Sequence, residues 1–146
     1  MIELRDVPFD PYVELGRFQA SIEALRGKYG ATSVFIGTMR DFNEGDSVQK
    51  LWLEHYPGMT ERQLSCIVNE ATQRWPILGS LVIHRVGEIE PADVLVVIGV
   101  WSSHRASAMD ASRYIIESLK SRAPFWKKEM LDQGEVSRWV QHNTPG

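Results

Sequence analysis

Four basic side chains crowd a short segment near the end of the chain, LKSRAPFWKKE at residues 119–129. They are Lys120, Arg122, Lys127 and Lys128, with no acidic residue before Glu129. Crowded cations repel one another and burial lowers the pKa of a lysine further, so a lysine in such a cluster can act as an acid, a base or a nucleophile. The same charges suit an anionic ligand, either a phosphate or a carboxylate. The competing interpretation is a solvated basic turn, because runs of charge usually lie at the surface.

Pro124 divides this basic cluster into two parts. A proline interrupts a helix, and the residue before it leaves the helical region, so Lys120 and Lys127 cannot belong to one continuous helix. The chain has to turn here, and the two ammonium groups can then converge from different elements. Phe125 and Trp126 follow the proline directly, and we expect them to anchor the turn or to form a wall of the site.

Three more basic residues occupy positions where ligands are often bound. His104 and Arg105 fall in the first turn of a predicted long helix, where free N–H groups and the helix dipole favour an anion. The alternative for His104 is a hydrogen-bonded histidine at the edge of the core. Arg40 follows a predicted strand and opens a glycine-containing loop, a common setting for a ligand-binding arginine. The alternative for Arg40 is an ordinary surface side chain.

Other residues that can do chemistry form weaker patterns. Glu54 and His55 are adjacent in a predicted strand, so their side chains point to opposite faces and do not act on one atom. A structural or subunit-interface role is expected for them. His55 and His84 lie on different strands without the ligand spacing of a zinc site, so no metal site is predicted. Cys66 falls off the apolar stripe of its helix, and a sulfur-carrying role is not expected for it.

Composition indicates a single globular domain over residues 1–146. Hydrophobic residues make up 43% and charged residues 24%, which is ordinary for a globular protein. No apolar run approaches the roughly 20 residues that span a bilayer, and the opening MIELRDVPFD lacks the apolar region of a secretory signal. With one cysteine, no internal disulfide is expected, and we predict a cytoplasmic protein. The net charge of −3 disfavours a general nucleic-acid binder.

Hydrophobic spacing and turn signals predict an α+β fold. Asp10 with Pro11 is typical of a helix start, and Thr60 with Gln63 has the pattern of a capping box. VLVVIGVW is apolar on both faces, which predicts a central strand. The expected elements are a helix from Pro11 to Gly30, strands at 31–39 and 48–56 around a loop at 40–47, a helix from Thr60 to Pro76, strands at 81–87 and 94–101, a helix capped by Ser102 or Ser103, and a hairpin of 125–131 and 135–140 that turns at 132–134. This order indicates a mixed sheet and a small second sheet near the C-terminus.

Seven motifs occur in a characteristic order: GTMRDFNEGDSV, LWLEHYPGMT, RWP, VIHRVGEIEPAD, SSHR, LKSRAPFWKKE and RWV. Together they closely resemble the large, catalytic subunit of molybdopterin synthase, the MoaE family. The resemblance extends from about residue 31 to residue 140. LEHYPGM and RAPFWKKE are its most specific parts.

The resemblance implies a fold, a reaction and an assembly. The fold is an α/β-hammerhead with an additional small antiparallel sheet, and two copies form a homodimer. Each end of the dimer holds a small ubiquitin-like, MoaD-like sulfur-carrier subunit, which gives a heterotetramer. The small subunit's C-terminal Gly-Gly tail carries a thiocarboxylate, from which sulfur passes twice to cyclic pyranopterin monophosphate to form the dithiolene of molybdopterin. No metal and no dissociable cofactor is implied for this step, and neither is a nucleic acid or a membrane.

The resemblance also assigns residues. Lys120 and Lys127 match the family's two pocket lysines and are expected to be catalytic and to contact substrate. The other expected substrate contacts are Thr38, Met39, Arg40, His104, Arg105, Lys128 and Glu129. Some relatives have lysine where this chain has Thr38, so the backbone is the expected contact there.

The implied chemistry explains why an acidic chain would concentrate positive charge. The substrate is a phosphate ester and the donor tail ends in an anion, so cations have to offset their repulsion. Lys120 is expected at the acyl centre, where it stabilises oxyanion charge, with Lys127 between that centre and the substrate. An alternative stays open: a non-catalytic module that binds a phosphate, a pterin or a nucleic acid through the same cluster, with Trp126 stacking on the ligand.

Overall fold

The computed structural model describes residues 1–43, 46–131 and 137–140, with side chains described at 1–41 and 49–129. Its elements, in chain order, are β1 (Ile2–Arg5), α1 (Pro11–Ser21), a 3₁₀ turn (Glu23–Leu25), β2 (Ala31–Thr38), β3 (Phe42–Asn43), β4 (Asp46–His55), α2 (Met59–Arg74), β5 (Ile77–Arg85), β6 (Gly87–Ile89), β7 (Val94–Ser102), α3 (Arg105–Arg122), β8 (Phe125–Leu131) and β9 (Ser137–Val140).

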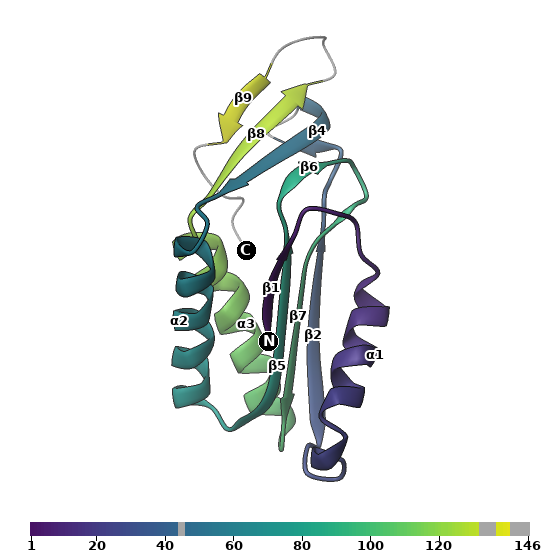
Figure 1. Cartoon of the computed structure of the whole chain (residues 1–146), viewed down its shortest axis with the longest axis vertical. Coiled ribbons are helices and arrows are strands. Elements are labelled where there is room, and N and C mark those ends of the chain that lie inside the picture. The colour runs from purple at the N-terminus through teal and green to yellow at the C-terminus, as the bar shows by residue number, and fades with distance from the viewer. Residues whose placement is uncertain (44–45, 132–136, 141–146) are drawn as a thin grey trace.

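The main sheet has four strands in the order β1-β5-β7-β2. β1 pairs with β5 in parallel and the other neighbours pair antiparallel, so the sheet is mixed, as predicted. β7 lies in the interior of the sheet, which agrees with its apolar character on both faces. Helices α2 and α3 cover one face of the sheet and α1 covers the other (Figure 1).

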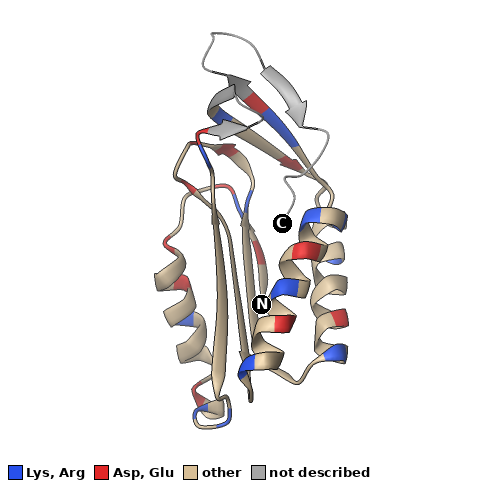
Figure 2. Ribbon diagram, turned by 180° about the vertical axis from the view of Figure 1, so that it is seen from behind, with Lys and Arg blue, Asp and Glu red and all other residues tan. Residues whose placement is uncertain are grey.

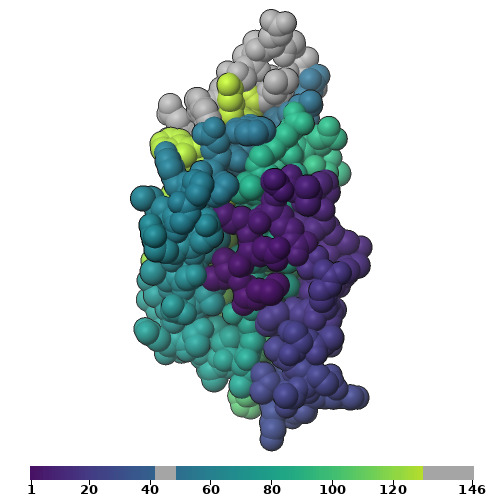
Figure 3. Space-filling view, in the orientation of Figure 1, coloured from purple at the N-terminus to yellow at the C-terminus, as the bar shows by residue number. Residues whose placement is uncertain are grey.

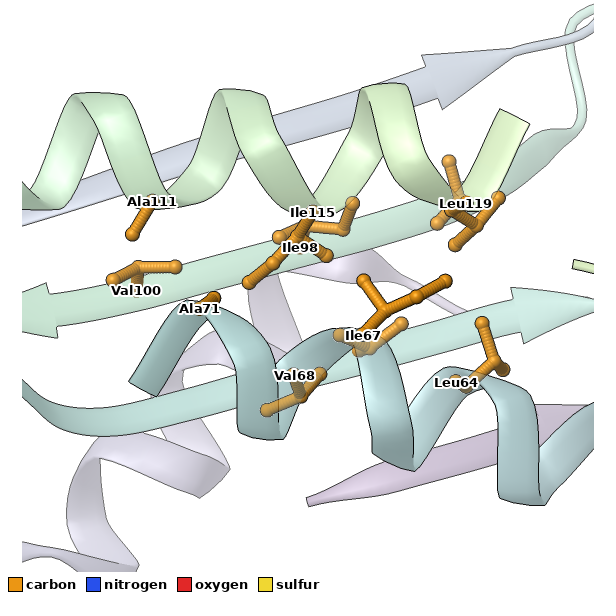
Figure 4. Packing of buried hydrophobic residues seen from close by; sticks show 11 residues of the cluster. Leu64, Ile67, Val68, Ala71, Ile98, Val100, Ala111, Ile115 and Leu119 are labelled. Atoms are coloured by element: carbon orange, nitrogen blue, oxygen red, sulfur yellow. The ribbon is translucent and has the colours of Figure 1, made fainter. Parts of the chain in front are cut away.

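The larger core lies between the sheet and helices α2 and α3. Its members include Leu64, Ile67, Val68, Ala71, Ile98, Val100, Ala111, Ile115 and Leu119 (Figure 4). Apolar residues recur every three or four positions on both helices, so each helix buries one stripe. Burial of each large aliphatic side chain contributes about 1.5–3 kcal/mol. Leu119 belongs to this core, which fixes the last turn of α3 immediately before Lys120.

The second sheet is entirely antiparallel. β3, β4, β8 and β9 are neighbours in that order, and β6 pairs with β4. It lies beyond one end of the main sheet (Figure 1). A small core of Met39, Leu51, Leu53 and Ile89, with Leu95 packed against it, connects the two sheets. The predicted α+β fold with a second, antiparallel sheet is therefore confirmed.

Several strand boundaries differ from the prediction. β1 was not expected, because its four residues have a partner only in the distant strand β5. The expected loop at 40–47 instead contains β3 and the start of β4. β5 begins at Ile77 rather than at 81, and β6 begins at Gly87, whose φ of 84° breaks the expected strand and favours glycine. The expected turn at 132–134 lies outside the described residues.

The start of α2 also differs. The helix begins at Met59, and the cap is completed by Glu61 rather than Gln63, since Glu61 Oε2 accepts a hydrogen bond from the Gly58 N–H at 3.0 Å. The predicted capping box at Thr60 is therefore wrong. Its hydroxyl instead forms hydrogen bonds with the backbone of Tyr56 and Pro124.

The predicted caps of the two other helices have different outcomes. Asp10 caps α1, and its carboxylate accepts from two backbone N–H groups of the first turn, as predicted. That helix ends at Ser21 rather than continuing to Gly30. α3 begins at Arg105, and its N-cap is His104 instead of either predicted serine. Ser102 instead donates to the Pro76 carbonyl at 2.8 Å.

The molecular surface carries charges of both signs. Basic and acidic positions alternate along the described helices (Figure 2). β1 reaches the surface between α2 and α1 (Figure 3). Within the described chain, no helix is both long and apolar enough to cross a membrane.

Candidate functional site

Lys120 and Lys127, hereafter the lysine pair, converge at the junction between α3 and β8. Lys120 lies in the last turn of α3, which ends at Arg122. Ala123, before the proline, is extended (φ −72°, ψ 133°), as Pro124 requires. The chain then enters β8, and the two ammonium groups come close enough to interact directly. The turn inferred from Pro124 is confirmed.

Thr60 links this turn to α2. Its buried hydroxyl accepts a hydrogen bond from the Tyr56 N–H at 3.0 Å and donates one to the Pro124 carbonyl at 3.2 Å. The LEHYPGMT segment therefore supports the turn that separates the two lysines. Sequence reasoning missed this role, because a threonine at the start of a helix is typical of a cap.

The surroundings lower the basicity of the lysine pair. Burial lowers the pKa of Lys127 to about 8, and repulsion by the Lys120 ammonium acts in the same direction. Glu129, buried on the same face of β8, acts against this shift in the pKa of Lys127. Burial also lowers the pKa of Lys120, and its interaction with Lys127 opposes that effect. Lys127 therefore titrates closer to neutral pH than an ordinary lysine does.

His84 is a buried neighbour of the lysine pair. Its ring stacks on Phe125, with centroids 4.2 Å apart and planes 17° from parallel. Its Nδ1 lies 2.7 Å from the Arg85 carbonyl oxygen. Burial lowers the pKa of His84 to about 3, and the charges of Lys120 and Lys127 add to the effect. No sequence pattern connects His84 with the lysines, and a metal-ligand role was the only one considered for it.

The other members of the basic cluster point elsewhere. Arg122 forms a bidentate ion pair with Glu70 of α2, at 2.6 and 2.9 Å. Lys128 is exposed and, by strand alternation, lies on the opposite face of β8 from Lys127 and Glu129. Trp126 is on that outer face too and is 51% exposed. Phe125 therefore anchors the turn, as expected, whereas Trp126 is no wall of the lysine site.

His104 and Arg105 are far from the lysine pair of the same chain. Both are exposed at the start of α3, whereas Lys120 lies in its last turn. The helix has 18 residues, which corresponds to a length of about 27 Å. One chain alone does not bring these two groups together.

Thr38, Met39 and Arg40 lie where β2 leaves the main sheet, at the end that carries the second sheet. The Met39 side chain is 6% exposed and belongs to the small core between the sheets. Its backbone N–H donates to the Asp93 carbonyl and its carbonyl accepts from the Ala92 N–H, both at 2.9 Å. Thr38 and Arg40 are exposed on either side of it. Met39 thus anchors this segment, and its side chain offers little surface to a ligand.

The described residues contain no group of three or more His, Cys, Asp or Glu side chains that could hold a metal ion. Cys66 is exposed on α2, as its position off the apolar stripe predicted. The lysine pair, by contrast, brings together two amino groups whose pKa values are both lowered.

Comparison with known proteins gives consistent matches. A family model described as "MoaE protein" matches residues 11–122. The molybdopterin synthase catalytic subunit of Ralstonia nicotianae is 48% identical over 139 residues, which cover 95% of this chain and 76% of that protein. The subunit of the same name from Escherichia coli is 52% identical over 118 residues, 81% of this chain and 77% of that protein.

A solved structure agrees with these sequence matches. The molybdopterin biosynthesis MoaE protein from Burkholderia ambifaria superimposes with a TM-score of 0.79 at 38% identity. The superposition covers 96% of this chain and 88% of that structure. The similarity therefore includes both sheets and the helices that cover the main sheet.

Proposed function

The chain belongs to the MoaE family, and from that premise we propose that it is the catalytic subunit of a molybdopterin synthase, acting in the cytoplasm. It transfers sulfur from the C-terminal thiocarboxylate of a small, ubiquitin-like subunit to cyclic pyranopterin monophosphate. Two such transfers complete the dithiolene. The observation that carries this proposal is the convergence of Lys120 and Lys127 at the Pro124 turn.

The lysine pair suits the chemistry of the donor tail. In each transfer the thiocarboxylate sulfur attacks a side-chain carbon of the substrate, and that carbon loses its bond to an oxygen. Water then hydrolyses the resulting thioester, so the sulfur stays on the substrate and the tail leaves as a carboxylate. Negative charge develops on the acyl oxygen in this hydrolysis, and the Lys120 ammonium stabilises it. Lys127, with a pKa of about 8, can gain or lose a proton near neutral pH and serves as a general acid or base.

Binding of the substrate requires further cations. Arg40 is exposed at the same end of the main sheet as the lysine pair, and we assign it to the substrate phosphate. His104 and Arg105 contact the same substrate only if a second copy of the chain supplies them, because α3 separates them from their own lysines. We therefore propose a homodimer with sites completed across the two chains. With one small subunit at each site, the assembly is a heterotetramer.

The expected contacts at Thr38, Lys128 and Glu129 form part of this proposal. Glu129 shares a face of β8 with Lys127, and its negative charge raises the pKa of Lys127 against the effect of burial. Thr38 is exposed beside Arg40. Lys128 projects from the outer face of the second sheet, so its contact with substrate also requires a neighbouring chain.

A reconstituted assay tests the proposed function. The chain is mixed with thiocarboxylated small subunit and cyclic pyranopterin monophosphate, and dithiolene is measured. We expect product only when all three components are present, and none when the small subunit ends in an ordinary carboxylate. Absence of product despite saturable binding of the small subunit would contradict the proposal.

One observation favours the second candidate, a nucleic-acid or pterin-binding module. The outer face of the second sheet exposes Trp52 and Trp126, at 45% and 51%, and Lys128 pairs directly with Trp52. Aromatic rings interleaved with a cation are typical of surfaces that stack bases. Oligonucleotide binding that weakens steeply with salt would support a nucleic-acid-binding module, and its absence would exclude that form of the candidate.

A further inference from the structure

We propose that His84 is a positioning residue for the lysine pair, and that its Nε2 accepts a hydrogen bond from the side-chain nitrogen of Lys120 or Lys127. The proposal rests on the proposed function, in which the two lysines are catalytic. Its physical content, a histidine–lysine contact in the free protein, is testable without the reaction.

The protonation of the His84 ring follows from its contact with the backbone. Nδ1 lies 2.7 Å from the Arg85 carbonyl oxygen, and a carbonyl can only accept. Nδ1 therefore carries the proton and donates it. Nε2 is then the unprotonated nitrogen of the neutral ring, with a lone pair available to a donor.

The sheet directs the His84 ring towards the lysines. His84 is paired with Val96 of β7, and Val96 belongs to the core beneath α2 and α3. The ring therefore lies on the face that α3 covers, near the end of the helix that carries Lys120.

The stacking on Phe125 brings β8 to the same place. Phe125 and Lys127 are two residues apart on this strand, so their side chains leave it on the same face. Since the Phe125 ring stacks on His84, Lys127 projects towards His84 as well.

The surrounding charges require a neutral acceptor at this position. Lys120 from α3 and Lys127 from β8 are the charged groups that act on His84, while Glu129 of β8 acts on Lys127. The sheet neighbours of His84, Leu4 and Val96, are apolar. A third cation would repel the pair, whereas an apolar side chain would offer the lysines no acceptor at this position. A neutral imidazole accepts the bond without adding charge.

Two measurements on the free protein test this contact. In long-range ¹H–¹⁵N spectra of histidine-labelled protein, we expect His84 as the neutral tautomer protonated at Nδ1. In ¹³C-lysine-labelled protein, the Cε signals report the titration of both lysines, assigned with K120R and K127R. A lysine that loses a hydrogen bond to its charged form has a lower pKa. H84F should therefore shift the titration of Lys120 or Lys127 downward by about one pH unit or more. H84Q keeps an acceptor, so its lysine titrations should remain nearer to those of the wild type.

The sulfur-transfer assay adds a functional readout. H84F should reduce kcat roughly 10- to 100-fold, move the pH–rate profile in the direction of the lysine titration, and leave binding of the small subunit unchanged. H84Q should recover much of kcat. The proposal is overturned if wild-type His84 is protonated at Nε2, or if the lysine titrations are the same in wild type, H84F and H84Q. An inactive wild type with the predicted titrations would contradict the proposed function and leave the contact intact.

Discussion

The hydroxyl of Thr60 donates a hydrogen bond to the Pro124 carbonyl, across 64 positions of the chain. This contact joins the first turn of α2 to the turn between Lys120 and Lys127. The same hydroxyl accepts from the Tyr56 N–H, so one side chain connects the end of β4, α2 and the lysine site. The geometry of the lysine pair therefore depends on a residue that carries no charge.

Replacement of Thr60 by valine tests this dependence. T60V keeps the size of the side chain but leaves the Tyr56 N–H and the Pro124 carbonyl, both in part-buried hydrogen bonds, without their partner. We expect this to cost about 1–3 kcal/mol of stability. We expect kcat to fall more than binding of the small subunit, because the turn at Pro124 loses its support. Urea unfolding and steady-state kinetics measure the two effects.

The matched control for this variant is T72V. Thr72 lies on the same helix, and its hydroxyl donates only to the local Val68 carbonyl at 2.9 Å. We expect T72V to keep wild-type kinetics. Equal kinetics of T60V and T72V would show that the lysine site does not depend on the Pro124 contact.

Lys127 should lower the stability of the fold at neutral pH. Its pKa is about 8 in the folded chain, against an ordinary value of 10.5. Between these two values the unfolded chain binds more protons than the folded chain, so wild-type stability rises with pH in that window. K127M removes the charge, and we expect it to be more stable than wild type at pH 7 by on the order of 1–3 kcal/mol.

Urea unfolding at pH 7 and at pH 10 measures this effect. The advantage of K127M should shrink at the higher pH, where the wild-type lysine is already neutral. K28M, at an exposed lysine, should show no comparable change. A K127M variant that is less stable than wild type at pH 7 would contradict the assignment of a strained, buried cation.

Arg122 should be dispensable for the reaction, although it lies two residues from Lys120. Its guanidinium is held by Glu70, which also accepts from the Tyr114 hydroxyl at 2.6 Å. The ion pair is partly exposed and connects α3 to α2. Exposed ion pairs contribute little to the stability of a fold. We expect R122Q to keep kcat/KM within about twofold of wild type, and K120Q to lose most of it. A loss in R122Q as large as that in K120Q would place Arg122 in the site.

Mixed dimers test whether two chains build one site. K120A and R105A are each expected to be inactive as homodimers. In a C2 dimer that mixes them, one site receives both defects and the other receives none, so an equal mixture should recover about a quarter of wild-type activity. If Lys120 and Arg105 instead act within one chain, each site of the mixed dimer carries one defect and no activity returns.

Local stereochemistry explains why part of this structure was predictable. Pro124 constrains the residue before it, whatever the rest of the chain does, and this was sufficient to predict the turn between the lysines. The continuous apolar run of β7 likewise predicted a central strand. The family resemblance then identified the function, which composition and spacing alone had left open.

Long-range contacts explain what was missed. β1 is a strand because β5 is beside it, and four residues of mixed polarity carry no local signal of that pairing. A threonine hydroxyl can cap a helix or bind a distant carbonyl, and the Thr60 hydroxyl binds the carbonyl of Pro124. His84 became part of the site only when Phe125, Lys120 and Lys127 were placed around it.

Single-turnover sulfur transfer by K120A, K127A and the double variant tests the lysine pair most directly, with binding of the small subunit measured in parallel. Because the two ammonium groups act as a unit, we predict that the double variant loses about as much rate as the more damaging single change, with binding retained. Wild-type rates in both single variants, or losses that simply multiply in the double variant, would contradict a shared site.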